Sequence, residues 1–193
     1  MMRADSTRLS NQFLIAMPGQ TGDTFAGAVV YLCEHTEKGA LGLVINKPID
    51  IKLKNLFERV ELPLDRPDMA EAPVYFGGPV QTERGFVLHE GVGGEAEPYN
   101  SSLKIPGGLE MTTSKDVLEA LSSGAGPKRV LITLGYSGWG AGQLEDEMSR
   151  NSWINVAAAP EVSFDTPVEQ RYGRALSLLG IDAGMLSQEA GHA

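Results

Sequence analysis

The stretch LGYSGWGAGQLEDEMSRNSW, residues 134–153, is the most informative part of this chain for its fold and its function. Four glycines surround Tyr136 and Trp139, directly after a strand-like run and directly before a helix-like one. Glycine at such a junction indicates a backbone that turns tightly or that other atoms approach closely. An aromatic pair held on a glycine-rich loop is more typical of a binding site than of a core. We therefore expect a loop here that marks a functional surface.

Outward from this stretch, short runs rich in β-branched and aromatic residues are bounded by Gly, Pro or Asn, as strands usually are. We expect strands over residues 13–17, 28–33, 41–45, 74–76, 86–89, 103–105, 109–112, 130–134 and 153–157. Apolar residues at helical spacing predict further helices over 53–60, between Ser114 and Gly124, and near the end of the chain. Helices that interrupt runs of strands, without regular alternation, indicate an α+β fold with about four helices.

The helix near the end of the chain has the clearest signals. Thr166-Pro167-Val168-Glu169 resembles a capping box with proline at the first helical position, and Gly180 suits a left-handed terminator. Its predicted buried stripe comprises Val168, Tyr172, Ala175, Leu176 and Leu179. No composition shift suggests a linker, so we expect one domain over residues 1–193, with residues 1 to about 10 as a mobile tail.

The composition excludes several classes of function. The net charge is -9 and the sequence pI is about 4.8, with 16 basic residues scattered among 25 acidic ones. Proteins that bind nucleic acid or anionic membranes need clustered Lys and Arg, so neither partner is expected. Cys33 is the only cysteine and lies in an apolar run, which predicts a buried, inert thiol. No segment has the pattern of a signal peptide or a membrane span, so we expect a cytoplasmic protein.

The central stretch contains no complete catalytic or phosphate-binding motif. A hydrolase nucleophile elbow needs Gly-x-Ser-x-Gly, but Ser137 is followed by Gly138 and then Trp139. The glycine patterns of nucleotide-binding loops are missing as well. Glu145, Asp146 and Glu147 would also repel an anion from the first turn of the helix. We expect no cofactor, and a cation, an amine or a neutral partner suits these charges better.

Two histidines and two sharp strand exits are further candidates for a metal site or a binding site. His35 and His89 each stand beside a glutamate at the end of a strand, but single residues on separate strands carry little information about metal ligation, so no metal site is predicted. Asn46-Lys47-Pro48 and Gly77-Gly78-Pro79 follow strands directly. Glycine and proline there favour turn chemistry, and the Asn46 amide could tie two loops together.

These motifs together resemble the YqgE/AlgH family, whose members are often labelled transcriptional regulators. The resemblance runs from about Phe13 to Ala193 and rests on VVYLCEH (29–35), GALGLVINKP (39–48), YFGGPV (75–80), VLHEG (87–91), GYSGWGAGQLEDE (135–147), NSW (151–153) and the terminal GHA. One departure is Asp23-Thr24, where relatives commonly have Asp-Pro before the phenylalanine.

The resemblance implies an α+β fold whose bifurcated mixed or antiparallel sheet curls into a pseudo-barrel. It also implies a bacterial cytosolic protein, and it implies no enzyme activity because the family has no established catalytic residues. The regulator label of the family rests on genetic association, and it does not imply a DNA-binding motif in this chain.

We therefore expect a cytosolic, non-enzymatic regulatory or adaptor protein that acts through a protein partner. Exposed Trp and Tyr on a rigid loop are typical interface anchors. The predicted contact residues are Tyr136, Trp139 and Gln143, with Glu145 and Asp146 setting the charge preference.

The alternative hypothesis is a small-molecule binder or an unrecognised hydrolase that uses a cleft near the GYSGWG segment. Strand exits often share one end of a sheet, so Asn46, His89, Ser137 and Glu145 could converge there. A hydrolase would need its nucleophile and base within hydrogen-bond reach of each other.

Overall fold

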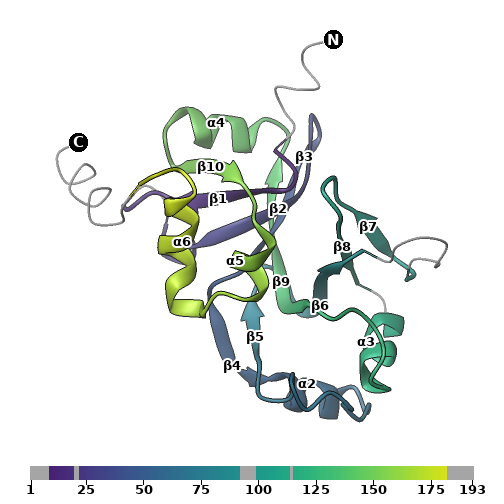
Figure 1. The fold of residues 1–193 in the computed structure, drawn as a ribbon. Helices are drawn as coiled ribbons and strands as arrows, with labels where there is room; N and C mark the ends of the chain where they lie inside the picture. The colour runs from purple at the N-terminus through teal and green to yellow at the C-terminus, as the bar shows by residue number, and fades with distance from the viewer. Residues whose placement is uncertain (1–8, 20–21, 92–98, 114, 182–193) are drawn as a thin grey trace.

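A computed structural model describes residues 9–19, 22–91, 99–113 and 115–181 of the chain. Its strands form one curled sheet in the order β10-β1-β2-β3-β9-β6-β8-β7, and β5 joins β9 and β4 at the side (Figure 1). The strands are β1 (Gln12–Ala16), β2 (Val29–Thr36), β3 (Gly39–Val44), β4 (Pro48–Lys52), β5 (Pro73–Phe76), β6 (Val80–Glu90), β7 (Ser102–Lys104), β8 (Leu109–Thr112), β9 (Val130–Gly140) and β10 (Trp153–Ala157). Among the strand pairs of the described residues, only β5–β9 is parallel.

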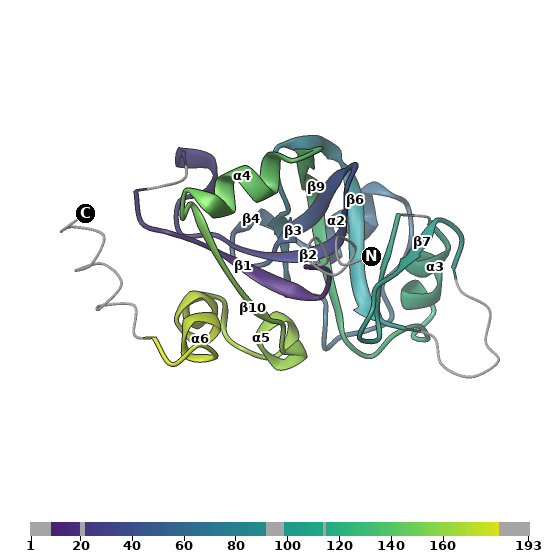
Figure 2. The ribbon, with the colours of Figure 1, turned by 90° about the horizontal axis from the view of Figure 1, so that it is seen from above.

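Short helices flank this sheet. They are η1 (Asp23–Phe25), α2 (Leu53–Arg59), α3 (Lys115–Ser122), α4 (Gln143–Ser149), α5 (Pro160–Phe164), η2 (Val168–Gln170) and α6 (Arg171–Ser177). Viewed from above, α4 lies on one face of the β1–β2–β10 part of the sheet, and α5 and α6 lie on the other face (Figure 2). The predicted α+β class and curled sheet are confirmed, and the described residues hold five α-helices where about four were expected.

Strand β9 is the point at which the sheet forks. Its first half pairs with β6, from Val130 opposite His89 to Leu134 opposite Gly85. Its second half pairs with β3, from Ser137 opposite Gly42 to Gly140 opposite Gly39. One strand therefore belongs to both halves of the bifurcated sheet.

The prediction that GYSGWG forms a loop is wrong, because this segment is the second half of β9. Its side chains alternate in the manner of a strand: Ser137 and Trp139 are buried, and Gly138 and Gly140 are exposed. Glycines lower the strand propensity of a segment, but pairing along β3 supplies the missing stabilisation. The helix that follows, α4, begins where the sequence indicated.

Glycines allow two backbones to cross closely beside the fork. A Cβ on Gly77 would lie 2.2 Å from the carbonyl oxygen of Gly135, and a Cβ on Gly78 would lie 2.2 Å from the carbonyl oxygen of Tyr136. Gly135 itself has a φ of 82°, in the left-handed region. The Ser137 hydroxyl also donates to the Gly77 carbonyl at 3.0 Å. The structural interpretation of the Gly77-Gly78-Pro79 turn is therefore supported.

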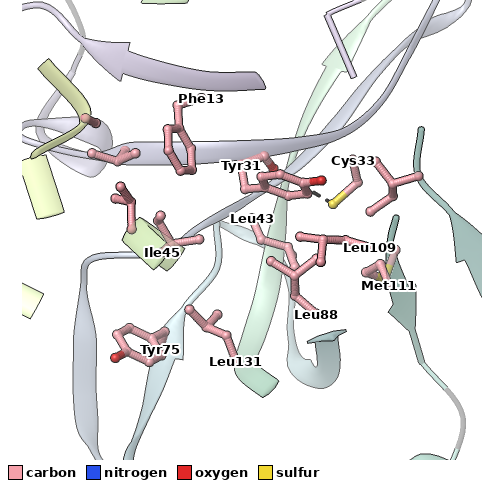
Figure 3. Packing of buried hydrophobic residues seen from close by; sticks show 14 of the residues in the cluster. Phe13, Tyr31, Cys33, Leu43, Ile45, Tyr75, Leu88, Leu109, Met111 and Leu131 are labelled. Carbon is pink, nitrogen blue, oxygen red and sulfur yellow. Dashed lines mark hydrogen bonds between the residues drawn. The ribbon is translucent and has the colours of Figure 1, made fainter. Parts of the chain in front are cut away.

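Two core layers lie on opposite faces of the first strands. Tyr31 and Cys33 on β2 point into the larger core, with Phe13, Leu43 and Leu88 (Figure 3). The alternate residues of β2 join a second cluster, which comprises Leu14, Ala16, Ala28, Val30, Leu32, Val44, Trp139, Leu144 and Trp153. Burial on both faces explains why β2 is an uninterrupted apolar run. A third cluster packs α2 and α3 against β5, β6 and β9.

The C-terminal helix differs from its prediction in three ways. The Thr166 hydroxyl donates to the Glu161 carbonyl at 2.9 Å, and no side-chain cap forms at the start of η2 or α6. The helix α6 begins only at Arg171, because α5 ends directly before this segment and Thr166 satisfies one of its last carbonyls. Leu179 is 40% exposed and does not belong to a buried stripe.

Several other predictions from the sequence can be compared with the structure. The helix predicted over 53–60 is α2, whereas β4 and α5 had no prediction. Cys33 is buried and its thiol donates to the Tyr31 carbonyl at 3.8 Å, so the predicted inert thiol is supported. The N-cap at Ser114, most of the predicted tail and the terminal GHA lie outside the described residues.

Candidate functional site

Three aromatic rings meet where β9, β10 and η1 come together. The ring centroids of Trp139 and Trp153 lie 5.9 Å apart with planes at 77°. Phe25 packs against both, edge-on to Trp153 at 5.5 Å and nearly parallel to Trp139 at 6.4 Å. The two indoles are almost completely buried, whereas Phe25 is half-buried and lies at the surface of the group. We call these three residues the indole cluster.

One carboxylate on α4 fixes both tryptophans. The Trp139 and Trp153 indole N–H groups donate to the same oxygen of Glu147, Oε1, at 3.0 Å and 2.9 Å. The other oxygen, Oε2, accepts a hydrogen bond from the Gln143 amide at 3.1 Å. Gln143 in turn accepts the Gly140 backbone N–H at 3.0 Å, which joins the end of β9 to the first turn of α4. Charge-assisted hydrogen bonds of this kind are stronger than neutral ones, so Glu147 orients the cluster.

A surface pocket of about 350 Å³ opens beside the indole cluster. It is lined by Gly22, Phe25, Gly138, Trp139, Gln143, Glu147, Arg150, Ser152 and Trp153. Aromatic rings, one carboxylate and one guanidinium thus converge on one concave surface. A volume in this range suits a single side chain or a small molecule. We call this hollow the indole pocket.

A second hollow lies along the same strand. It has a volume of about 400 Å³ and shares Gly138 and Trp139 with the indole pocket, and it also includes Tyr136 and the β2–β3 turn. Tyr136 is half-buried and packs edge-on against Phe86 at 5.4 Å. The two hollows therefore form one indented surface that follows the second half of β9.

The acidic side chains of α4 have partners within the chain. Asp146 pairs with Arg150 one helical turn away, at 2.5 Å. Glu145 contacts Nε2 of the buried His35 at 2.9 Å. The backbone N–H of Leu9 donates to Nδ1 of that histidine, so Nδ1 is an acceptor and Nε2 carries the proton toward Glu145. His35 thus has no lone pair left for a substrate.

The structure brings together only some of the predicted contact residues. Trp139 and Gln143 line the indole pocket, Tyr136 lines the neighbouring hollow, and Glu145 and Asp146 lie on the adjoining helix α4. However, Trp139 is only 6% exposed, so the expectation of a freely exposed aromatic anchor is wrong for this residue. Its ring belongs to a core cluster, and little of it is left exposed in the pocket wall.

Asn46 and His89 lie elsewhere. The Asn46 amide accepts the Val29 N–H at 2.8 Å and donates to the Gly27 carbonyl at 2.9 Å, so it ties the two segments as suggested. His89 is fully buried, and its ring contacts the Glu90 carbonyl at 2.8 Å and the Thr112 hydroxyl at 2.7 Å. These buried polar contacts stabilise the fold without lining the indole pocket.

The predicted convergence of Asn46, His89, Ser137 and Glu145 is wrong. His89 on β6 lies opposite Val130, the first residue of β9, whereas Ser137 lies toward the other end of β9. At about 3.3 Å per residue the two are separated by roughly 23 Å. Each of the four side chains has its own partners, because Asn46 follows β3, His89 lies on β6, Ser137 lies within β9 and Glu145 lies on α4.

Phe25, Glu147, Arg150 and Trp153 were missing from the predicted contact residues. Glu147 could have been found from its spacing, since residues four apart share one face of a helix and Gln143 was already a candidate. Trp153 ends the informative stretch and lies three residues beyond Arg150. Phe25 has no local signal for this role, because more than a hundred residues separate it from both tryptophans.

Within the described ranges, His, Cys, Asp and Glu side chains form no group of three or more that could hold a metal ion. In the same part of the chain, no helix is long and apolar enough to cross a membrane. The candidate site is therefore defined by the indole pocket and its rim on α4.

A forked, curled sheet with short flanking helices places this chain among mixed α+β proteins. The chain belongs to the AlgH-like (DUF179) family, which it matches over residues 13–184. It is 64% identical over 190 residues to a UPF0301 protein of Burkholderia cenocepacia, with 98% of each chain covered. It is 65% identical over 199 residues to a UPF0301 protein of Variovorax paradoxus, with both chains covered completely. The predicted family is confirmed.

Solved structures agree with this assignment. The fold is similar to the solution structure of the AlgH protein from Pseudomonas aeruginosa, with a TM-score of 0.76, 46% identity and full coverage of both chains. A crystal structure of protein DIP2367 from Corynebacterium diphtheriae gives a TM-score of 0.67 at 20% identity and covers 86% of this chain and 85% of that one. At that identity the second likeness concerns the fold alone.

Proposed function

We propose that this protein is a cytosolic, non-enzymatic adaptor that exerts a regulatory effect by binding a protein partner at the indole pocket. The observation that carries the proposal is the pre-organised hollow itself. The pocket brings together three packed rings, a carboxylate that accepts three hydrogen bonds, and a neighbouring guanidinium. Strands β9 and β10 and helices η1 and α4 hold these groups in place. Aromatic and arginine side chains in pockets of this kind dominate the binding energy of protein interfaces.

The non-enzymatic part of the proposal is supported by the hydrogen bonds of the nucleophile and base candidates. The Ser137 hydroxyl is buried and donates to a backbone carbonyl. Both ring nitrogens of His35 and of His89 are engaged within the chain. A general base needs a free lone pair within reach of a substrate proton.

The charge of the protein supports a protein partner over nucleic acid. A net charge of -9 gives no basic footprint for phosphates. The rim of the pocket carries Asp146 and Glu147 on α4, and these would repel a phosphate backbone. We accordingly propose that any effect on transcription is indirect and passes through the bound partner.

The test is site-specific photo-crosslinking in the native host. A benzophenone amino acid would replace Gln143 at the rim of the indole pocket, and a matched variant would carry it at Glu119, which is exposed on α3. We expect one reproducible protein adduct from position 143 that position 119 does not give. Adducts that are identical at both positions, or adducts with DNA, would contradict the proposal.

A further inference from the structure

The indole pocket has the chemistry to recognise a positively charged, planar group. We propose that it binds an arginine side chain of the partner, with the guanidinium against the aromatic wall and donating to Oε2 of Glu147. This inference rests on the proposed function and specifies the recognition chemistry of that site. It follows from the acceptor capacity of Glu147, the local charge and the ring geometry.

The two oxygens of Glu147 differ in acceptor capacity. Oε1 already accepts two indole N–H groups, whereas Oε2 accepts one bond, from Gln143. A carboxylate oxygen has room for about two donors, so Oε2 retains a free lone pair. The three donors around the carboxylate are neutral, and its negative charge has no ion-pair partner within 4.0 Å among the described residues. A cationic donor would supply both the missing hydrogen bond and the missing charge.

The groups around the pocket favour a cation over an anion. Arg150 lines the pocket, but its guanidinium is paired with Asp146 at 2.5 Å. Two carboxylates against one guanidinium leave a negative charge on this turn of α4. The nearby Glu145 is bound to His35 and adds to the negative field. The overall charge of -9 acts in the same direction during encounter.

The spacing of the rings decides where a cation can lie in the indole pocket. Phe25 and Trp139 are nearly parallel with centroids 6.4 Å apart. A group inserted between two rings needs about 7 Å, which is twice an ordinary contact distance of about 3.5 Å. No cation can therefore enter between these two rings, and a bound group has to lie against the outside of the cluster. A flat, weakly hydrated guanidinium can lie against the open side of the cluster and still reach the carboxylate.

Gln143 occupies the place that the arginine would take. Its amide nitrogen donates to Oε2 at 3.1 Å, and its side chain is exposed, so it can be displaced at small cost. A guanidinium that donates two N–H groups to Oε2 uses both acceptor positions of this oxygen and therefore displaces the Gln143 amide. Removal of the Gln143 amide should therefore increase the affinity of the pocket for arginine, a result that a purely structural role of the pocket does not predict.

The experiment uses intrinsic fluorescence, because the chain has only two tryptophans and both line the indole pocket. The probes are acetyl-Gly-Arg-Gly-amide, its citrulline counterpart, which has the same shape without the charge, and its lysine counterpart. We expect saturable change of emission by the arginine peptide with a Kd of roughly 1 mM, as for a single-residue contact. The citrulline and lysine peptides should bind at least about tenfold and threefold more weakly.

Two variants of the full-length chain complete the test. Gln143→Ala should bind the arginine peptide about three- to tenfold more tightly, and Glu147→Gln at least about tenfold more weakly. Circular dichroism checks that each variant is folded. If Glu147→Gln does not fold, the binding of the arginine peptide to Gln143→Ala still decides the test. Equal binding of the arginine and citrulline peptides, equal binding of arginine and lysine, or weaker binding to Gln143→Ala would overturn the inference.

The outcome also separates this inference from the proposed function. A protein adduct from position 143 without any response to the arginine peptide would refute the arginine inference and leave the partner-binding function intact. A selective response to the peptide without a protein adduct would support the pocket chemistry and count against the adaptor function.

Discussion

Replacement of Glu147 by alanine tests how the indole cluster is held together. The change removes the single acceptor of two indole N–H groups, on residues that are 6% and 2% exposed. A buried donor without a partner costs about 1–3 kcal/mol, so the two together predict a loss of about 2–6 kcal/mol. Typical domains have a stability of about 5–15 kcal/mol, and the variant should still fold but unfold much more easily.

The matched variants are Glu147→Gln and Asp146→Asn. The glutamine keeps an oxygen that can accept both indoles, but it loses the charge assistance and the hydrogen bond from the Gln143 amide, at a cost of about 2 kcal/mol. Asp146 makes an exposed pair with Arg150, and its loss should cost at most about 1 kcal/mol. Urea unfolding followed by circular dichroism and by tryptophan fluorescence measures all three variants. The reasoning fails if Glu147→Ala unfolds at the same urea concentration as Asp146→Asn.

Three further predictions follow from other parts of the structure. Gly77→Ala should lower the free energy of unfolding by about 1–3 kcal/mol or more, because its Cβ would lie 2.2 Å from a backbone oxygen. The control is Gly140→Ala, whose Cβ meets nothing closer than 3.9 Å and which should change stability by less than about 1 kcal/mol. Equal melting temperatures of the two variants would refute the contrast. Burial raises the pKa of the Cys33 thiol, so a thiol reagent at pH 8 should react at least about 1000-fold more slowly than with urea-unfolded protein. Hydrogen bonds from Lys52 and Lys54 lower the pKa of Glu71 from 4.5 to about 2. The stabilisation of the folded state by these bonds is present above pH 4.5 and is lost as the pH falls toward 2. An NMR titration of Glu71 with a midpoint near 4.5 at low salt would contradict this prediction.

The sequence predicted most of the sheet because its strands carry local signals. The uninterrupted apolar run of β2 follows directly from its burial on both faces. The second half of β9 could not be recognised, because its three glycines resemble a loop and its stabilisation comes from pairing with β3, almost a hundred residues earlier in the chain. Segments whose conformation depends on distant partners are the ones that local patterns misassign.

The candidate site shows the same division. The sequence indicated Trp139 and Gln143 because both lie in one dense motif, but it could not show that an indole in a glycine-rich segment is buried. Phe25 reaches the site only through the fold, since η1 and β10 are far apart along the chain. Conversely, Asn46 and His89 looked available in the sequence, and the structure shows that backbone and hydroxyl groups already bind them.

The pairing of β1 with β10 has a consequence for the synthesis of this protein. Gln12 lies opposite Ala157, so β1 acquires this outer neighbour only after more than a hundred further residues have been made. The fork at β9 adds a similar delay, because β3 and β6 wait for residues 130–140 before they are joined. Pairings over such long distances along a chain are slow to form. Until then, the unpaired edges of β1 and β3 can pair with the strands of other chains.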